Sequence, residues 1–348
     1  MTHTIDRRRL IHGGAAGLAA LHAGLSCGTA AALQRGGGTR NPNVLRTPEA
    51  AFDDVDFPYV PRYTTVDVTT ANTGPVRIAS YTDGPRGGEP VLLMHGNPTW
   101  SYLYRDMMPL FAAAGYRVTA VDLYGFGRSD KPADAALYTY RAVEEAMVLW
   151  FQAQRLSGVN LFVQDWGGLI GLRVLAQEMN SFARVVTANT AFPSGGRNGE
   201  PGPTPTFLGF EQAVQQGDTI PAASFAVQEA TDRVLSPGAL ADYDAPAPSQ
   251  DFLTPFRTLP SLVPWDADQD GARRNAQFQR VLSRTTKPWL TLQGENDMIT
   301  TGWNTYFQGL VPGATGQPHA VLRDVNHFCQ EDAPDELVRR SVAFFAAN

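Results

Sequence analysis

The sequence predicts an α/β fold: a mostly parallel, doubly wound sheet with an inserted helical cap. From about Val76, short runs rich in β-branched residues alternate with longer stretches of helical periodicity, the pattern of β-α-β units. This alternation stops between residues 192 and 264 and resumes at Lys287. With 348 residues, 43% hydrophobic and 18% charged, the chain is long enough for one large domain that carries such an insertion.

Seven short apolar segments are predicted to form the strands of the sheet. They span residues 76–81, 90–95, 117–122, 160–165, 184–189, 287–293 and 319–324. Among the helices between them, residues 140–156 place Val143, Met147 and Trp150 on one face, and Gly158 follows the expected end.

The core is expected in two parts, residues 44–191 and 265–348. Between them, residues 192–264 are rich in Pro, Gly, Ala and Gln and contain amphipathic pieces at 207–216 and 222–235. Because this segment is too long for a structureless loop, we expect a helical cap. It would cover the carboxyl ends of the strands, where such folds bind their ligands.

The first 32 residues predict a twin-arginine export signal. Asp6-Arg7-Arg8-Arg9-Leu10-Ile11 matches the motif, and a weakly apolar stretch with small residues near its end follows. Cys27 raises lipidation as an alternative, but Gly24 stands where an apolar residue is expected. We therefore expect a periplasmic or secreted protein with a flexible linker at 33–43. The alternative is a cytoplasmic protein with a basic N-terminus.

Charge and composition indicate which partners to expect. The formal net charge of −6 is spread over residues of both signs without a basic stripe, which argues against nucleic acid or an anionic membrane. The apolar part of the signal is too short to span a bilayer, so the mature form is not expected to insert stably. Two distant cysteines give no disulfide framework. A small apolar substrate fits best, and the sequence indicates no oligomeric state.

The strand that ends at Asp165 is followed by Trp166-Gly167-Gly168 and a helix. In the serine version of this turn, the nucleophile stands on a sharp strand-to-helix corner beside small residues, and the next backbone N–H points toward it. Here the corner presents a carboxylate. Taken alone, Asp165 could also be a helix cap or a solvated charge, but its neighbours favour a nucleophile.

A second turn follows the strand at 90–95, with the sequence His95-Gly96-Asn97-Pro98. Such a turn can supply a backbone N–H to an oxyanion hole, so we assign the hole to the amides of Asn97 and Trp166. His95 is interpreted as a structural residue that holds the turn.

A base and an acid follow in the order expected for a catalytic triad. His327 lies just past the last strand, and Asp297 lies at the end of the preceding one, where an acid can orient an imidazole. Glu295 is the competing acid, and Asp297 is favoured.

A carboxylate nucleophile is ionised at neutral pH and can displace a leaving group from an sp³ carbon, which forms an alkyl ester. His327, oriented by Asp297, would then activate the water that attacks this ester. No cofactor is required, and the sequence contains no metal-binding motif.

The leaving group distinguishes the candidate reactions. A halide needs N–H donors in an apolar pocket, and the Trp166 indole and the Asn97 amide can supply two. An epoxide oxygen needs acidic hydroxyl donors, and Tyr243 is the one tyrosine inside the predicted cap.

These motifs resemble those of the haloalkane dehalogenases, a family of the α/β-hydrolase superfamily. They are HGNPTWSYLYR at 95–105, DLYGFGRSDKP at 122–132, VQDWGG at 163–168 and NHF at 326–328. The similarity extends from about Val44 to Phe345 and weakens in the cap. It implies an α/β-hydrolase fold, with Asp165 as nucleophile, His327 as base, Asp297 as acid and Trp166 as halide donor.

The cap departs from one pattern of this family. Members with a second tryptophan donor carry it early in the cap, where this chain has Phe207 and Phe210. A phenyl ring has no N–H, so both are assigned to the apolar wall of the substrate pocket. Asn189 stands at the position where other members carry the acid. The combination resembles the branch with an Asp-His-Asp triad and Asn and Trp donors.

The sequence thus predicts hydrolytic dehalogenation of haloalkanes to an alcohol and a halide. One alternative is an epoxide hydrolase that uses the same Asp-His-Asp triad. Another is an exported binding or scaffold protein on a degenerate hydrolase fold, which is disfavoured because nucleophile, base, acid and oxyanion hole are all present.

Overall fold

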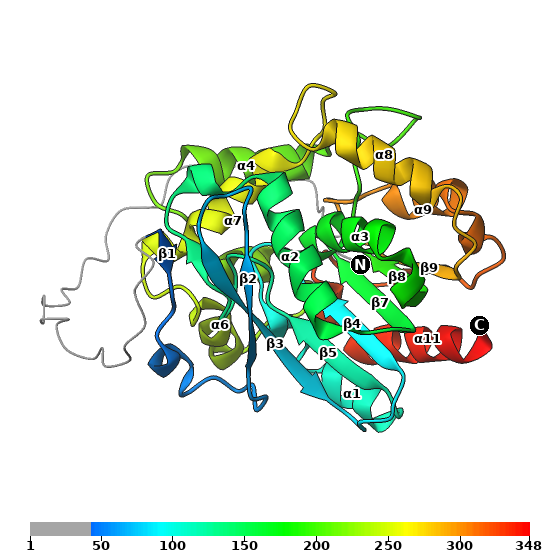
Figure 1. Ribbon diagram of the computed structural model, residues 1–348, viewed down its shortest axis with the longest axis horizontal. Helices are drawn as coiled ribbons and strands as arrows, with labels where there is room; N and C mark the ends of the chain where they lie inside the picture. The colour runs from blue at the N-terminus through cyan, green and yellow to red at the C-terminus, as the bar shows by residue number, and fades with distance from the viewer. Residues whose placement is uncertain (1–42) are drawn as a thin grey trace, which may run out of the picture. The chain divides into compact units, whose positions relative to one another are not determined.

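Within residues 43–348, the part of the chain described by the computed structural model, eight strands form the central sheet in the order β10-β9-β8-β7-β4-β5-β3-β2 (Figure 1). They are β2 (Arg62–Asp67), β3 (Pro75–Asp83), β4 (Pro90–Met94), β5 (Arg117–Val121), β7 (Val159–Gln164), β8 (Phe182–Ala188), β9 (Trp289–Gly294) and β10 (Ala320–Leu322). Only β3 runs antiparallel to its neighbours, β2 and β5, and the other pairs are parallel. The prediction of a mostly parallel sheet is confirmed.

All seven predicted strands are present, with ends shifted by a few residues. The prediction missed β2, an edge strand whose side chains are mostly exposed and carry no strong apolar pattern. It also missed β1 (Val44–Leu45) and β6 (Lys131–Pro132), which pair with each other. The expected export signal at 1–32 and the linker at 33–43, except Asn43, lie outside the described residues.

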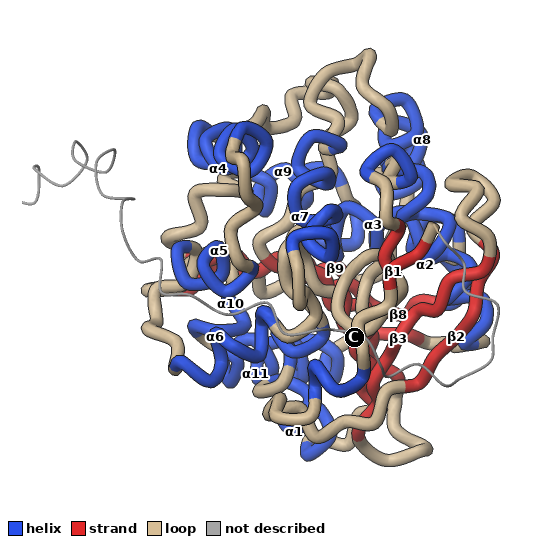
Figure 2. Tube along the Cα trace, turned by 90° about the vertical axis from the view of Figure 1, so that its left-hand side faces the viewer, coloured by secondary structure: helices blue, strands red, loops and turns tan. Residues whose placement is uncertain are grey.

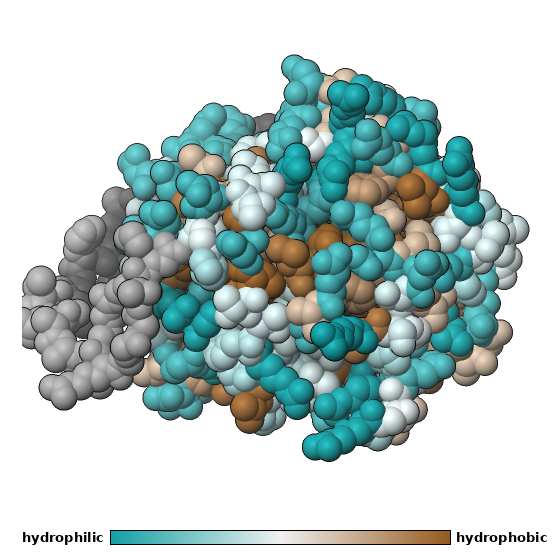
Figure 3. Space-filling model, in the orientation of Figure 1, coloured by the Kyte–Doolittle hydropathy of each residue, from teal (hydrophilic) through white to brown (hydrophobic). Residues whose placement is uncertain are grey.

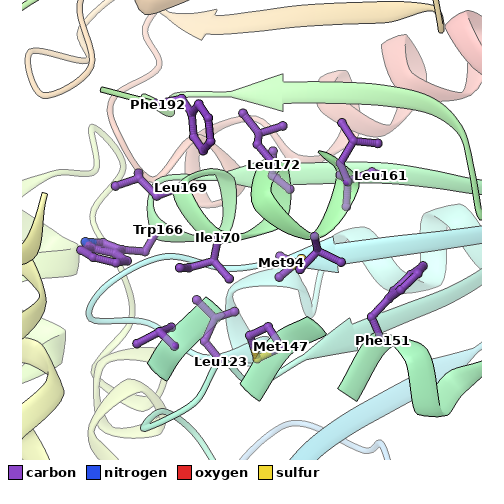
Figure 4. Close-up of a cluster of buried hydrophobic side chains, with 14 of the residues drawn as sticks. Met94, Leu123, Met147, Phe151, Leu161, Trp166, Leu169, Ile170, Leu172 and Phe192 are labelled. Atoms are coloured by element: carbon purple, nitrogen blue, oxygen red, sulfur yellow. The ribbon is translucent and has the colours of Figure 1, made fainter. Parts of the chain in front are cut away.

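Helices cover both faces of the sheet. On one face lie α2 (Tyr140–Gln154), α3 (Trp166–Gln177), α8 (Ala272–Leu282) and α9 (Trp303–Leu310), and on the other lie α1 (Met107–Ala113) and α11 (Pro334–Ala347). The side chains of β4 point alternately to the two faces of the sheet. Leu92 and Met94 therefore pack in the core on the first face, and Val91 and Leu93 pack in the core on the second. Figure 4 shows part of the first core, where Met94 packs near Ile170 of α3 and Met147 of α2.

Helix α2 is shorter than predicted. Thr139 caps its start by accepting a hydrogen bond from the Ala142 amide (3.0 Å). The helix ends at Gln154, because Arg155 adopts a left-handed conformation (φ 53°). Gly158, predicted just beyond the end of the helix, has a positive φ of 66° immediately before β7.

Residues 192–264 contain helices and loops but no strand. The helices are α4 (Pro205–Gln216), α5 (Ala223–Glu229), α6 (Pro237–Asp244) and α7 (Thr254–Thr258), with 3₁₀ turns at Gln250–Leu253 and Leu259–Leu262. Thr204 and Ser236 cap α4 and α6, each followed by a proline at the first helical position. The amphipathic piece predicted at 222–235 is helical only to Glu229.

These helices lie beyond the carboxyl ends of the parallel strands, on the left of Figure 1. Figure 2 views the chain from that side, with α4, α5 and α6 one below another. On the face shown in Figure 3, hydrophilic side chains cover most of the surface. No helix among residues 43–348 combines the length and the apolar character needed to cross a membrane.

A buried ion pair joins the helices of the first face. Arg173 of α3 contacts Glu144 of α2, and both side chains are almost fully buried. Arg274 of α8 binds the same carboxylate. Because α3 begins next to Asp165, this pair fixes the helix that carries the strand-to-helix turn.

We expect Glu144→Gln to lower the free energy of unfolding by about 3–5 kcal/mol, because it leaves the Arg173 charge buried without its partner. Urea unfolding measures this change. The control is Glu336→Gln, which removes the exposed pairs to Arg339 and Arg340 and should change the free energy by less than about 1 kcal/mol. Equal effects of the two variants would contradict the role assigned to the buried pair.

Candidate active site

Asp165 stands on a strained turn between β7 and α3. Its backbone has φ 48° and ψ −126°, a conformation that costs a non-glycine residue about 1–3 kcal/mol. Hydrogen bonds hold it there: its N–H donates to Asn189 O (3.0 Å), and its carbonyl accepts from Thr190 Oγ1 (2.7 Å) and Gly168 N (2.8 Å). The turn places Asp165 directly after the last residue of β7 and directly before the first residue of α3.

The neighbouring turn closes tightly over this carboxylate. The backbone N–H of Asn97 donates to Asp165 Oδ1 at 2.7 Å. A Cβ on Gly96 would lie 2.3 Å from the same oxygen, so only glycine fits there. The amide of Trp166, the first residue of α3, is one of the N-terminal amides that lack a partner within the helix. One carboxylate oxygen is therefore bound by the Asn97 amide, one of the two amides of the predicted oxyanion hole.

His327 connects the carboxylate to a buried acid. Its Nε2 lies 3.5 Å from Asp165 Oδ2, and its Nδ1 lies 3.1 Å from Asp297 Oδ1. Asp297 also accepts hydrogen bonds from Gln293 Nε2 (2.8 Å), the Ile299 amide (2.9 Å) and the Thr300 hydroxyl. Asp297 thus orients the imidazole. The competing acid, Glu295, is exposed.

The charges of the three groups shift two pKa values. Burial lowers the pKa of His327, but the charges of Asp297 and Asp165 and its hydrogen bonds to both outweigh burial and raise the pKa to about 10. Burial raises the pKa of Asp297, but the charge of His327 and hydrogen bonds from His327, Thr300 and the Ile299 amide hold it below its usual value. The negative charge on Asp165 is therefore one of the factors that keep His327 protonated.

A cavity of about 210 Å³ opens above these groups. Six of the predicted site residues line it: Asn97, Asp165, Trp166, Phe207, Phe210 and His327. Asp297 lies behind His327 and does not reach the cavity. Phe210 stacks on Phe256 of α7, with ring centroids 5.8 Å apart. The cavity therefore lies between the strand ends and the cap helices.

Two N–H groups are available on the cavity wall. Trp166 lies at one end of the apolar cluster in Figure 4, and its indole N–H has no hydrogen-bond partner among the described residues. The Asn97 amide donates one hydrogen to Phe256 O (3.2 Å), which leaves its second hydrogen available. The cap carbonyl thus fixes the direction of the Asn97 amide.

Two other residues considered from the sequence, His95 and Tyr243, do not line the cavity. Both ring nitrogens of His95 have backbone partners, Gly96 O (2.8 Å) and Leu123 N (2.9 Å), and burial lowers its pKa. It therefore connects two turns, as interpreted from the sequence. Tyr243 does not line the cavity, and its hydroxyl donates to the buried Glu331.

Two residues of the site, Gln164 and Asn189, were not predicted from the sequence, where Asn189 was noted only at the position at which other family members carry the acid. Asn189 Nδ2 donates to Asn326 O (2.8 Å) and His327 O (3.0 Å), while its Oδ1 accepts from Gly294 N (2.7 Å). It therefore links the histidine turn to β8 and β9. Gln164 contacts His327 directly. Both residues are polar and lie at the ends of neighbouring buried strands, and this was the sequence signal that could have identified them.

Among the described residues, no cluster of His, Cys, Asp or Glu could hold a metal ion.

The fold and the arrangement of the site are those of an α/β hydrolase: an aspartate on the strand-to-helix turn, a backbone amide of the neighbouring turn bound to its carboxylate, and a histidine after the last strand. In agreement, residues 89–334 match the family described as alpha/beta hydrolase fold.

Similar proteins show which family of α/β hydrolases the chain belongs to. The chain is 41% identical to a haloalkane dehalogenase of Mycobacterium marinum, over 87% of this chain and 99% of that protein, and 38% identical to one of Psychrobacter cryohalolentis, over 88% and 99%. The tetrameric haloalkane dehalogenase DpaA from Paraglaciecola agarilytica NO2 has a TM-score of 0.77 at 26% identity, over 88% of this chain and 98% of its own. An epoxide hydrolase of Caballeronia sordidicola is 26% identical over 80% of the chain. The chain belongs to the haloalkane dehalogenase family.

Gly96→Ala is expected to lower kcat/KM for halide release by about 100-fold, because the new methyl group displaces the Asp165 carboxylate. The protein should stay folded by circular dichroism. Gly87→Ala is the matched control, since a Cβ there meets nothing within 4 Å, and its activity should equal that of the parent. Full activity of Gly96→Ala would contradict the tight fit.

Proposed function

We propose that this protein hydrolyses small haloalkanes to an alcohol and a halide through an alkyl ester on Asp165. The two oxygens of the Asp165 carboxylate support this proposal because their environments differ: the Asn97 amide binds Oδ1, while Oδ2 lies 3.5 Å from His327 Nε2, and Asp165 lines the cavity. The apolar cavity fits a small halogenated substrate.

In the first step, Asp165 Oδ2 attacks the carbon that carries the halogen. The new C–O bond forms as the carbon–halogen bond breaks, and the electron pair leaves with the halide. The indole N–H of Trp166 and the free N–H of Asn97 would stabilise the departing anion in an otherwise apolar cavity. His327 takes no part in this displacement, because a carboxylate needs no base to activate it.

In the second step, His327 removes a proton from water, and the hydroxide attacks Asp165 Cγ. The oxyanion that develops on Oδ1 is held by the amides of Asn97 and Trp166. The intermediate then releases the alcohol, which leaves with Oδ2 and receives a proton from His327. The new carboxylic acid loses its proton to solvent. The net products are one alcohol, one halide and one proton.

Formation of the ester also lowers the pKa of the base, His327. The ester removes the negative charge of Asp165, one of the factors that raise the pKa of His327. The pKa of the imidazole therefore falls after alkylation. This fall favours the unprotonated form of His327, which must accept the proton from water.

Epoxide hydrolysis is less well supported. Opening an epoxide requires hydroxyl donors at the developing alkoxide, and no tyrosine lines the cavity in the described chain. Tyr243, the candidate from the sequence, is turned toward Glu331.

His327→Gln is expected to release one halide per active site and then to stall, because the ester forms but loses its base, which contributes about 10²–10⁴-fold. Rapid-quench halide assays measure the burst, and mass spectrometry should find the alkyl group on the peptide that contains Asp165. Asp165→Asn is the control and should give no burst. Continuous turnover by His327→Gln, or an adduct on another residue, would refute the mechanism.

We also propose export through the twin-arginine route, supported by the N-terminal sequence Arg7-Arg8-Arg9-Leu10-Ile11. The double variant Arg7→Lys/Arg8→Lys should keep the protein in the cytoplasm, as measured by cell fractionation. Arg9→Lys is the matched control and should still be exported. Export of the double variant at the parent level would rule out this route.

A further inference from the structure

Gln164, the last residue of β7, approaches the imidazole of His327 from below the active-site cavity. Its side chain is completely buried. Its amide nitrogen lies 3.2 Å from His327 Nε2 and 3.2 Å from the backbone oxygen of the same residue. Gln164 therefore contacts the ring nitrogen that must accept the proton from water.

The backbone contact determines which end of the amide faces the ring. A carbonyl oxygen only accepts hydrogen bonds, so the nitrogen end of Gln164 must point toward His327 O. The second hydrogen on that nitrogen is then directed at Nε2. Such a contact is favourable only when Nε2 presents its lone pair, that is, when Nδ1 carries the ring proton and donates it to Asp297.

The other end of the amide indicates that packing alone does not explain this residue. Gln164 Oε1 is buried and has no hydrogen-bond partner among residues 43–348. An unpaired buried acceptor destabilises a folded protein, and an apolar side chain of similar size would avoid that cost.

The groups around the imidazole differ in which protonation state of the ring they favour. Asp165 and Asp297 both favour the protonated ring. On α10 (Cys329–Asp332), burial raises the pKa of the Cys329 thiol, which stays neutral, and Glu331 is paired with Arg105. Glu229 of α5 lines the cavity but is exposed, so solvent screens it. Among these contacts, that of Gln164 favours the unprotonated ring.

We infer that Gln164 is a positioning residue that keeps the lone pair of His327 Nε2 available to water once Asp165 has been esterified. This inference rests on the proposed function. In the free protein the two carboxylates outweigh the amide, but in the alkyl-enzyme one of them is neutral. Gln164 then helps to bring the pKa of His327 toward the working pH, where a general base is most effective.

The test replaces the amide by an acid of the same shape. In Gln164→Glu, the carboxylate accepts from a protonated Nε2 and holds the proton on the ring. Gln164→Met removes the donors and keeps the volume, in case the acid prevents folding. The matched control is Asn160→Asp, an amide-to-acid change at the other end of β7, beside Arg184 and far from His327.

For Gln164→Glu, the acid limb of the kcat profile should move up by about one pH unit or more, since one hydrogen bond to a single protonation state has about that effect. At pH values well below the parent's acid limb kcat should fall about tenfold, and it should approach the parent value at alkaline pH. The halide burst should stay at one per site. Gln164→Met should shift the limb in the same direction by less, and Asn160→Asp should not shift it.

A second measurement does not depend on turnover. With Asp165→Asn as a neutral replacement for the ester, NMR titration gives the pKa of His327 with and without Gln164→Glu. A rise of about one unit supports the inference even if the parent releases no halide, a result that would refute only the proposed function. Unchanged pH profiles in both Gln164 variants, or an unchanged His327 pKa, would overturn it.

Discussion

The hydrogen bond from the Asn97 amide to Asp165 Oδ1 is the contact on which the rest of the site depends. It gives the two oxygens of one carboxylate different environments: Oδ1 is bound in the proposed oxyanion hole, and Oδ2 is left near His327. The contact is possible only because Gly96 has no side chain and because Asp165 tolerates a positive φ. A strained backbone and a missing Cβ therefore hold the carboxylate in the position that both proposed chemical steps require.

The cap covers the active site and also helps to hold its residues in position. Phe256 O of α7 directs the Asn97 amide, and Phe210 packs on the ring of the same residue. On the other side, the Phe328 amide donates to Ala230 O (3.1 Å), and the Tyr243 hydroxyl binds Glu331, just beyond the histidine turn. The proposed halide donor and the base are thus both held partly by cap residues, which connects the shape of the cap to the chemistry below it.

Sequence patterns predicted the parallel strands and the elbow at Asp165 because burial on both faces and a strand-Asp-Trp-Gly-Gly turn leave strong local signals. They missed β2, since an exposed edge strand needs no apolar pattern, and they extended α2 beyond Arg155, since a left-handed arginine leaves no signal. The contacts of Gln164 and Asn189 were not predictable. Each joins segments more than 100 residues apart, and only the strand order brings those segments together.

In the proposed mechanism, the oxygen of the alcohol comes from Asp165 and not directly from water. A single turnover in H₂¹⁸O, with enzyme in excess over substrate, tests it most directly. The alcohol should be unlabelled and the carboxylate of Asp165 should contain ¹⁸O, because water attacks Cγ while Oδ2 leaves with the product. Labelled alcohol in the first turnover, with an unlabelled Asp165, would contradict it.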